Sequence, residues 1–326
     1  MDGIRGLAIL MVFFHHSLRI KLLWMGVDLF FILSGFLITG VLLNAKGKSL
    51  GSYIGQFYAR RVRRIMVPYF ITLVLVSLIF GVAWMRHWYL YVFLTNLLLP
   101  LHIPHPVAFD PLWSLAVEEQ FYFVWPFAVY FLSERRLKWF AIFLIALAPC
   151  LRFGLHFHQH WPIYTLLPFR MDLMAVGGLL CVAYRNARPL LERWGVTIGI
   201  ISVGIGLCGL LELSRIGVTT YGNTRLGNLL IYECSLLMCT GIMLWALSGK
   251  GVGVLCLRPF TYIGTISYSM YLVHMGVLTL LGQHLPAAAT TVIGLAITVS
   301  YASISWYLIE SPLLNQARKS RVPHPV

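Results

Sequence analysis

The sequence IRGLAILMVFFHHSL, residues 4–18, is an apolar stretch with an arginine near its start and a histidine near its end. Arg5 and His16 are eleven residues apart. That is about three turns of an α-helix, so both side chains lie on one face, about 16 Å apart along the axis. Such side chains are costly on a membrane helix unless they face protein or water. We therefore expect partners for this face elsewhere in the chain.

Composition places the whole chain in a membrane. Of its 326 residues 59% are hydrophobic and 11% are charged, and the mean hydropathy is +0.80. Apolar runs long enough to cross a bilayer recur from end to end. The net charge of +14 is explained by basic residues that flank membrane spans, so we expect no nucleic-acid partner. The cysteines have no metal-site or disulfide spacing, and we expect no metal.

The sequence predicts an all-α, polytopic helical bundle with about ten transmembrane spans. They lie at residues 4–18, 27–44, 65–84, 114–132, 138–155, 169–184, 194–213, 228–247, 260–282 and 287–309. Residues 88–101 are too short for a crossing and predict a re-entrant or interfacial helix. The membrane domain is expected to cover residues 1–312, and a short basic cytoplasmic tail residues 313–326.

Basic residues orient this arrangement. Those in the loop 45–64 and those near residues 135, 188, 250 and 318 fall on one side of a ten-span bundle. The positive-inside rule makes that side cytoplasmic and places both termini there. Several residues do not fit the rule: Arg19, Lys21, Arg86, Arg152, Arg170, Arg215 and Arg225.

In this orientation Asp28, Glu118, His16 and His274 share the outer half of the bundle, and Ser114 lies at the same depth. A histidine oriented by a carboxylate can take a proton from a hydroxyl. The alternative is that these residues form interhelical hydrogen bonds that fix packing. Haem ligation would need a second histidine pair at matched depth, and none is evident. Two nearby carboxylates, those of Asp110 and Glu119, are expected to face water.

The segment FYARRVRRIMVPY, residues 57–69, carries four arginines at the expected inner boundary. Its guanidinium groups are suited to bind the phosphates of a nucleotide. They are equally suited to anchor the helix to lipid phosphates. The sequence alone leaves both interpretations open.

Six blocks, in order, resemble the acyltransferase-3 family of integral-membrane O-acyltransferases, which includes acetylases of bacterial surface polysaccharides. The blocks are DGIRGLA with the later His16, GVDLFFILSGFLI (26–38), RRVRR (60–64) with Pro68, WSLAVEEQFYFVWP (113–126), ISYSMYLVH (266–274) and WYLIESP (306–312). The resemblance spans nearly the whole chain. The family's proline often comes one residue earlier than Pro68.

The resemblance implies a cytoplasmic acyl-CoA donor, usually acetyl-CoA, no permanently bound cofactor, and a carbohydrate or glycolipid acceptor outside a bacterial inner membrane. It carries family residues over onto Arg5, His16, Arg60, Arg61, Arg64 and Glu118. Trp113, Tyr122, His274 and Glu310 are further candidates from the same blocks. Some members carry an extracytoplasmic hydrolase-like domain. We expect this chain to act alone or with a separate extracytoplasmic transferase.

As a hypothesis, Arg5, Arg60, Arg61 and Arg64 hold the donor. His16 serves as general base or transient acyl carrier. Either Glu118 or Asp28 orients His16, and Ser114 stabilises the oxyanion. A transporter or flippase of a polar envelope metabolite is the alternative, since the same residues could line a substrate path. A non-catalytic membrane partner is the other rival class. The sequence does not identify the acceptor or the acyl group.

Overall fold

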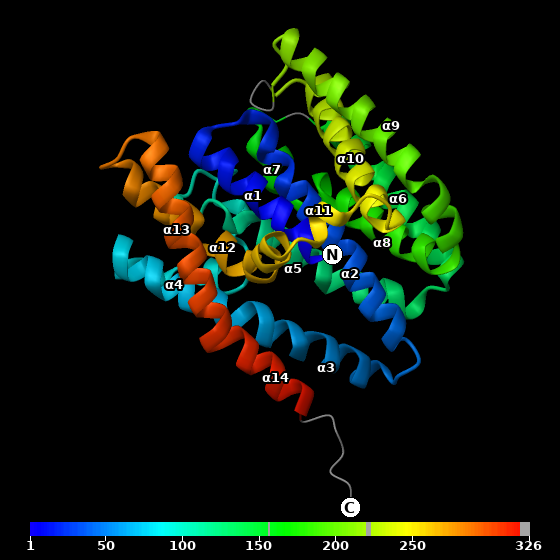
Figure 1. Ribbon diagram of the computed structural model, residues 1–326, viewed down its shortest axis with the longest axis horizontal. Coiled ribbons are helices and arrows are strands. Elements are labelled where there is room, and N and C mark those ends of the chain that lie inside the picture. Colours follow the sequence, from blue (N-terminus) through cyan, green and yellow to red (C-terminus); the bar gives the residue numbers. More distant parts are fainter. Residues whose placement is uncertain (156, 220–222, 320–326) are drawn as a thin grey trace, which may run out of the picture.

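The computed structural model describes residues 1–155, 157–219 and 223–319. Within these ranges the chain forms helices and connecting turns, without a β-strand (Figure 1). This confirms the predicted all-α helical bundle.

Seven helical segments of the described chain are long and apolar enough to cross a bilayer. They are Lys21–Ala45, Leu50–Phe80, Glu134–Gly154, Arg188–Arg215, Arg225–Ser248, Arg258–Gly282 and Ala287–Asn315. In order, they contain α2 (Gly26–Ala45), α3 (Leu50–Arg61) with α4 (Val67–Phe80), α6 (Glu134–Gly154), α9 (Arg188–Arg215), α10 (Arg225–Ser248), α12 (Arg258–Gly282), and α13 (Ala287–Ser305) with part of α14 (Ser311–Lys319). Each overlaps a span predicted from the sequence.

The other three predicted spans are also helices. They are α1 (Asp2–Leu18), α5 (Leu112–Phe131) and α8 (Met171–Asn186), with 17, 20 and 16 residues. A crossing needs about 17–25 apolar residues, so α1 and α8 lie at or below the lower limit. The helical bundle is confirmed, and the number of ten crossings stays a prediction.

Figure 1 shows α9 and α10 side by side along one edge, with α13 on the opposite side and α3 and α14 along the lower edge. The peripheral helices expose apolar side chains, such as Ile200 on α9 and Val292 on α13, at 65% and 71%. Such surfaces suit contact with lipid. The core lies between α1, α2, α5, α8 and α12.

Helices α1 and α12 pack backbone to backbone, because glycines remove the side chains between them. A Cβ atom added at Gly6 would lie 2.3 Å from the carbonyl oxygen of Phe260. One added at Gly264 would lie 1.8 Å from the carbonyl oxygen of Asp2. Small residues permit this close approach in membrane bundles. The contact aligns α12 along the face of α1 that carries Arg5 and His16.

The predicted helix at residues 88–101 is wrong in form. The segment contains two single 3₁₀ turns, Trp88–Leu90 and Thr95–Leu97, and Phe93 has a left-handed φ of 55°. Irregular backbone is stable at membrane depth only where protein satisfies its polar groups.

Side chains from neighbouring elements satisfy that backbone. The hydroxyl of Tyr69 donates to the carbonyl oxygen of Leu90 at 2.8 Å, and Gln159 donates to that of Pro100 at 2.7 Å. Asn96 and Gln120 exchange two side-chain hydrogen bonds of 3.2 and 3.0 Å, which join the segment to α5. The polar residues of this stretch and of α5 therefore replace the hydrogen bonds of a helix.

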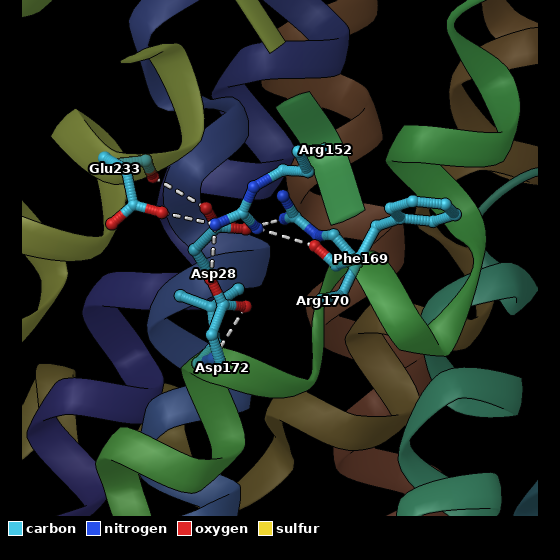
Figure 2. Close-up of polar contacts among 8 residues, drawn as sticks. Asp28, Arg152, Phe169, Arg170, Asp172 and Glu233 are labelled. Atoms are coloured by element: carbon cyan, nitrogen blue, oxygen red, sulfur yellow. Dashed lines mark hydrogen bonds and ion pairs between the residues drawn. The ribbon is translucent and has the colours of Figure 1, made fainter. Parts of the chain in front are cut away.

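A buried network of charges joins α2, α6, α8 and α10 (Figure 2). Arg152 on α6 and Arg170 at the N-cap of α8 are fully buried. The Arg152 Nη2 atom lies 2.7 Å from Asp172 Oδ2 and also pairs with Glu233, while Nη1 donates to the carbonyl oxygen of Phe169 at 2.7 Å. Arg152 therefore ties three elements together.

The second half of this network centres on Asp28. Arg170 Nη2 pairs with Asp28 Oδ1, and the hydroxyl of Ser235 donates to Oδ2 at 2.6 Å. The rings of Tyr232 and Tyr164 lie 4.7 and 5.6 Å from the Arg170 guanidinium carbon, at distances suited to cation–π attraction. Burial in this network explains why Arg152 and Arg170 do not follow the positive-inside rule.

We predict that Asp28→Ala destabilises the protein by about 3–5 kcal/mol, because it leaves a buried guanidinium without its counter-charge. The double variant Asp28→Ala/Arg170→Met is expected to recover most of that loss, since both charges are then gone. Thermal unfolding of the detergent-purified proteins, followed by tryptophan fluorescence, measures both effects. A single variant as stable as the wild type would contradict this account.

Candidate active site

One face of α5 lines a partly open cavity. Ser114, Glu118 and Tyr122 are spaced four residues apart, so their side chains follow one another along the helix. All three border a cavity of about 340 Å³. Phe30, Phe31 and Ser34 of α2 and Tyr268 and Tyr271 of α12 form much of the remaining wall.

The four arginines that the sequence assigned to the donor line this same cavity. Arg5 comes from α1, Arg60 and Arg61 come from the end of α3, and Arg64 follows in the π-helical turn Val62–Met66. Arg5 also forms an ion pair with Asp2 at 2.8 Å. The structure thus brings together side chains from five of the six sequence blocks.

The π-helical turn has a cause in the sequence. Pro68 has no N–H group, so it cannot donate to the carbonyl oxygen of Arg64 four residues earlier. The helix widens over Val62–Met66, and the hydroxyl of Tyr268 donates to the carbonyl oxygen of Ile65 at 2.9 Å. Such turns are frequent at functional sites. Here the turn places Arg64 at the cavity wall.

Arg64 and Arg61 differ in their surroundings. In the described part of the chain no hydrogen bond or ion pair is formed by the Arg64 side chain. Arg61 Nη2 instead lies 2.5 Å from Glu119 Oε1, and its guanidinium carbon lies 3.7 Å from the centre of the Tyr122 ring. The expectation that Glu119 faces water is wrong, because its side chain is only 12% exposed.

His16 and His274 meet, as the shared-depth prediction requires. The Nδ1 atom of His274 lies 2.6 Å from the carbonyl oxygen of Tyr271, so the proton is assigned to Nδ1 and Nε2 becomes an acceptor. This Nε2 atom lies 3.2 Å from Nδ1 of His16, which also lies 3.0 Å from the carbonyl oxygen of Val12. Both contacts fit a proton on His16 Nδ1. The lone pair of neutral His16 is then on Nε2, which is the atom able to accept a proton.

Two residues link the histidine pair to the cavity. Tyr271, on the cavity wall, lies beside His274 with 5.4 Å between ring centres. Its hydroxyl lies 2.7 Å from Ser114 Oγ and donates to the carbonyl oxygen of Pro111 at 2.9 Å. His16 itself does not line the cavity. It contacts His274, and His274 contacts Tyr271 on the cavity wall.

Asp28 lies in a different polar cluster from the one predicted. Both of its carboxylate oxygens are engaged by Arg170 and Ser235 (Figure 2). It is therefore in no position to orient His16, and Glu118 is the predicted carboxylate that faces the cavity. The sequence interpretation failed because depth in the membrane does not indicate which side of a helix a residue occupies.

Two further candidates have packing roles in this structure. Trp113 is buried with its ring 4.8 Å from that of Tyr164, and it does not line the cavity. Glu310 is buried in a second π-helical turn, Trp306–Glu310, where Ser269 donates to its carboxylate at 2.6 Å.

Ser34 is a cavity residue that the sequence analysis missed. Its hydroxyl bonds to that of Tyr122, which also donates to Glu118 Oε2 at 3.3 Å. The only sequence signal is an isolated serine in the apolar run of α2. No group of three or more His, Cys, Asp or Glu side chains suited to hold a metal occurs among the described residues.

The segment before α5 packs over α12 near the histidine pair. Ala108 lies beside Gly276, with 3.4 Å between its Cβ and a Cβ added there. Within this segment His105 Nε2 lies 2.8 Å from Asp110 Oδ1, and its Nδ1 lies 2.5 Å from the carbonyl oxygen of Ile103. Burial lowers the pKa of His105, but these two hydrogen bonds raise it by more, so the pKa lies above its usual value.

We predict that the hydrogen bonds of His105 to Asp110 and Ile103 weaken as the pH rises. Because the pKa of His105 is raised in the folded state, the stabilisation that these bonds give is complete below the unfolded pKa, near 6.5. That stabilisation is lost as the pH rises through the folded pKa. Hydrogen exchange of residues 102–112, corrected for intrinsic rates, should therefore quicken between pH 6 and pH 9. In the His105→Gln variant, residues 102–112 should exchange quickly over the whole range from pH 6 to pH 9. An unchanged pH response in that variant would refute the assignment.

Known proteins give this arrangement a family. The acyltransferase domain family matches residues 1–310, and the chain belongs to it. The peptidoglycan O-acetyltransferase OatA of Listeria monocytogenes is 27% identical, over 96% of this chain and 55% of its own length. The putative peptidoglycan O-acetyltransferase YrhL of Bacillus subtilis is 25% identical, over 98% and 55%.

The O-acetyltransferase OatA of Staphylococcus aureus is 24% identical, over 98% of this chain and 58% of the relative. The chain thus spans little more than half the length of these curated relatives. No solved structure matches it.

Proposed function

We propose that the protein is a membrane O-acyltransferase that moves an acyl group, most simply acetyl, from acyl-CoA to a hydroxyl of a cell-wall carbohydrate. One observation carries the proposal. A single cavity has the arginines Arg5, Arg60 and Arg64 in its wall and also borders Ser114 and Tyr271, which lead to the histidine pair. The names of the relatives, which act on peptidoglycan, support the acceptor class.

The donor's anionic nucleotide would bind where guanidinium groups gather. Arg5 and Arg64 supply charge-assisted hydrogen bonds to phosphate. The pantetheine arm is a narrow extended chain, and the mostly apolar wall of the cavity suits it. We place the arginine side in the cytoplasm, following the positive-inside rule, in a bacterial inner membrane.

We place the acceptor hydroxyl at His16 Nε2, on the histidine side of Tyr271, because Nδ1 of His16 is engaged by His274 and Val12. His16 Nε2 would take the proton of that hydroxyl, whose oxygen attacks the thioester carbonyl carbon. The Ser114 hydroxyl, which now bonds to Tyr271 and to the carbonyl oxygen of Pro111, would turn its proton to the resulting oxyanion. The C–S bond then breaks, the ester forms, and the proton passes to the departing CoA thiolate. Glu118 is the carboxylate on the cavity wall. The acyl group could alternatively be received by a separate extracytoplasmic transferase.

We predict that His16→Ala lowers acyl transfer by about 10²–10⁴-fold, because a general base is lost. His15→Ala is the matched control, since the His15 ring bonds to the carbonyl oxygen of Ile20 rather than to His274. The measurement is base-labile acetate released from purified cell-wall glycan, relative to the amount of protein in the membrane.

An active His16→Ala protein would show that another group is the base. If acetylation of the glycan requires acetyl-CoA, the protein is distinguished from a transporter, which would move a metabolite without modifying it.

We predict that Arg64→Met weakens the binding of acetyl-CoA by about tenfold or more, through loss of one charge-assisted hydrogen bond to phosphate. Titration calorimetry on the detergent-purified protein measures the affinity. Arg63→Met is the control, because Arg63 shares the π-helical turn but does not line the cavity. Equal effects of the two variants would contradict a donor role for Arg64.

A further inference from the structure

Tyr122 is held on three sides. Its backbone carbonyl oxygen accepts a hydrogen bond from the hydroxyl of Tyr58 at 3.0 Å. That oxygen is available because Pro126, four residues later in α5, has no N–H group to donate to it. The hydroxyl of Tyr53 in turn donates to the carbonyl oxygen of Pro126 at 3.0 Å. A proline inside α5 thus creates the site at which α3 attaches.

The ring of Tyr122 is covered by Arg61, with 3.7 Å between the guanidinium carbon and the ring centre. Tyr58 and Arg61 are three residues apart on α3, so one face of that helix holds both the backbone and the ring of Tyr122. Glu119 holds Arg61 in turn at 2.5 Å, and it precedes Tyr122 by three residues on α5. The hydroxyl of Tyr122 is left to bond to Ser34 and Glu118 inside the cavity.

Burial of its ion pair distinguishes Arg61 from Arg5, whose pair with Asp2 is more exposed, and from Arg64, which has no ion pair among the described residues. Its Nη2 atom is committed to Glu119, its Nε atom is buried, and the side chains of Arg61 and Glu119 are only 11% and 12% exposed. A buried, paired guanidinium adds little net charge to a phosphate site, and removal of its carboxylate partner is costly. The cation over the ring face also polarises the phenol, so the hydroxyl becomes a better hydrogen-bond donor to Glu118.

We propose that Arg61 and Glu119 are a positioning pair, which fixes Tyr122 so that its hydroxyl holds the Glu118 carboxylate in the cavity, and that Arg61 is not a ligand of the acyl donor. This assigns a role to Glu119, and it divides the arginine run into a structural member, Arg61, and a donor-binding member, Arg64. The inference rests on the proposed function for its acetylation and acetyl-CoA-binding measurements, whereas the stability measurement is independent of it.

The test is a cycle of Arg61→Met, Glu119→Gln and the double variant, with Arg64→Met as the comparison. Each single variant should lower glycan acetylation by about tenfold or more, because it leaves one buried charge alone, while the affinity for acetyl-CoA stays within about threefold. The double variant should regain acetylation and thermal stability, since methionine can pack on the ring without a counter-charge. Arg64→Met should lose affinity instead.

Tyr122→Phe distinguishes positioning from simple packing. It keeps the ring under Arg61, so its unfolding temperature should stay closer to the wild-type value than those of Arg61→Met and Glu119→Gln. It should still lose acetylation, because Glu118 then keeps only its hydrogen bond with Ser34. The proposal is overturned if Arg61→Met weakens acetyl-CoA binding as much as Arg64→Met does. It is also overturned if the double variant is no better than either single variant, or if Tyr122→Phe is fully active.

Failure of the proposed function would look different. If the wild-type protein binds no acetyl-CoA, the donor assignment falls. Acetylation and stability across the cycle still decide the role of the Arg61–Glu119 pair, because neither measurement requires the donor to be known.

Discussion

A charge surrounded by apolar helices is stable only where an opposite charge, a hydrogen bond or water compensates for its lost hydration. This constraint divides the arginines of the bundle into two groups. Arg152, Arg170 and Arg61 each have a carboxylate partner, and they join helices that are distant in the sequence. Arg64 lies at the cavity wall without such a partner among the described residues. Within the described ranges, the charge of Arg64 therefore lacks a carboxylate partner at the cavity wall, and an anionic ligand could supply one there.

Prolines direct the positions of these charges. Pro68 leaves the carbonyl oxygen of Arg64 without a helical donor, and the chain widens into a π-helical turn that brings Arg64 to the cavity. Pro126 leaves the carbonyl oxygen of Tyr122 to Tyr58, which fastens α3 to α5. In both cases a proline within an apolar helix leaves one backbone carbonyl oxygen without its helical donor. At Pro68 the helix changes to a π-helical turn, and at Pro126 the side chain of Tyr58 donates to the carbonyl oxygen instead.

Helical periodicity and membrane depth predicted much of this site. The position of Ser114, Glu118 and Tyr122 on one helix and the shared depth of His16 and His274 follow from local pattern. The contact between the two histidines is a result of tertiary packing. What failed depended on helix rotation and tertiary packing, which a single sequence does not specify. Asp28 lies at the predicted depth but turns toward Arg170, and Glu119 pairs across α3 and α5. The irregular backbone of residues 88–101 is stabilised by side chains as far away as Gln159, which no local pattern indicates.

The central claim is that one cavity receives the nucleotide end of a thioester donor at Arg5 and Arg64 and presents its acyl end near Ser114. A cryo-EM reconstruction of the protein with acetonyl-CoA, in which a ketone replaces the thioester, tests this claim most directly. We predict phosphate density within hydrogen-bond distance of both guanidinium groups and the ketone beside the Ser114 hydroxyl. Density for the analogue outside the cavity, or an empty cavity at saturating concentration, would contradict the account.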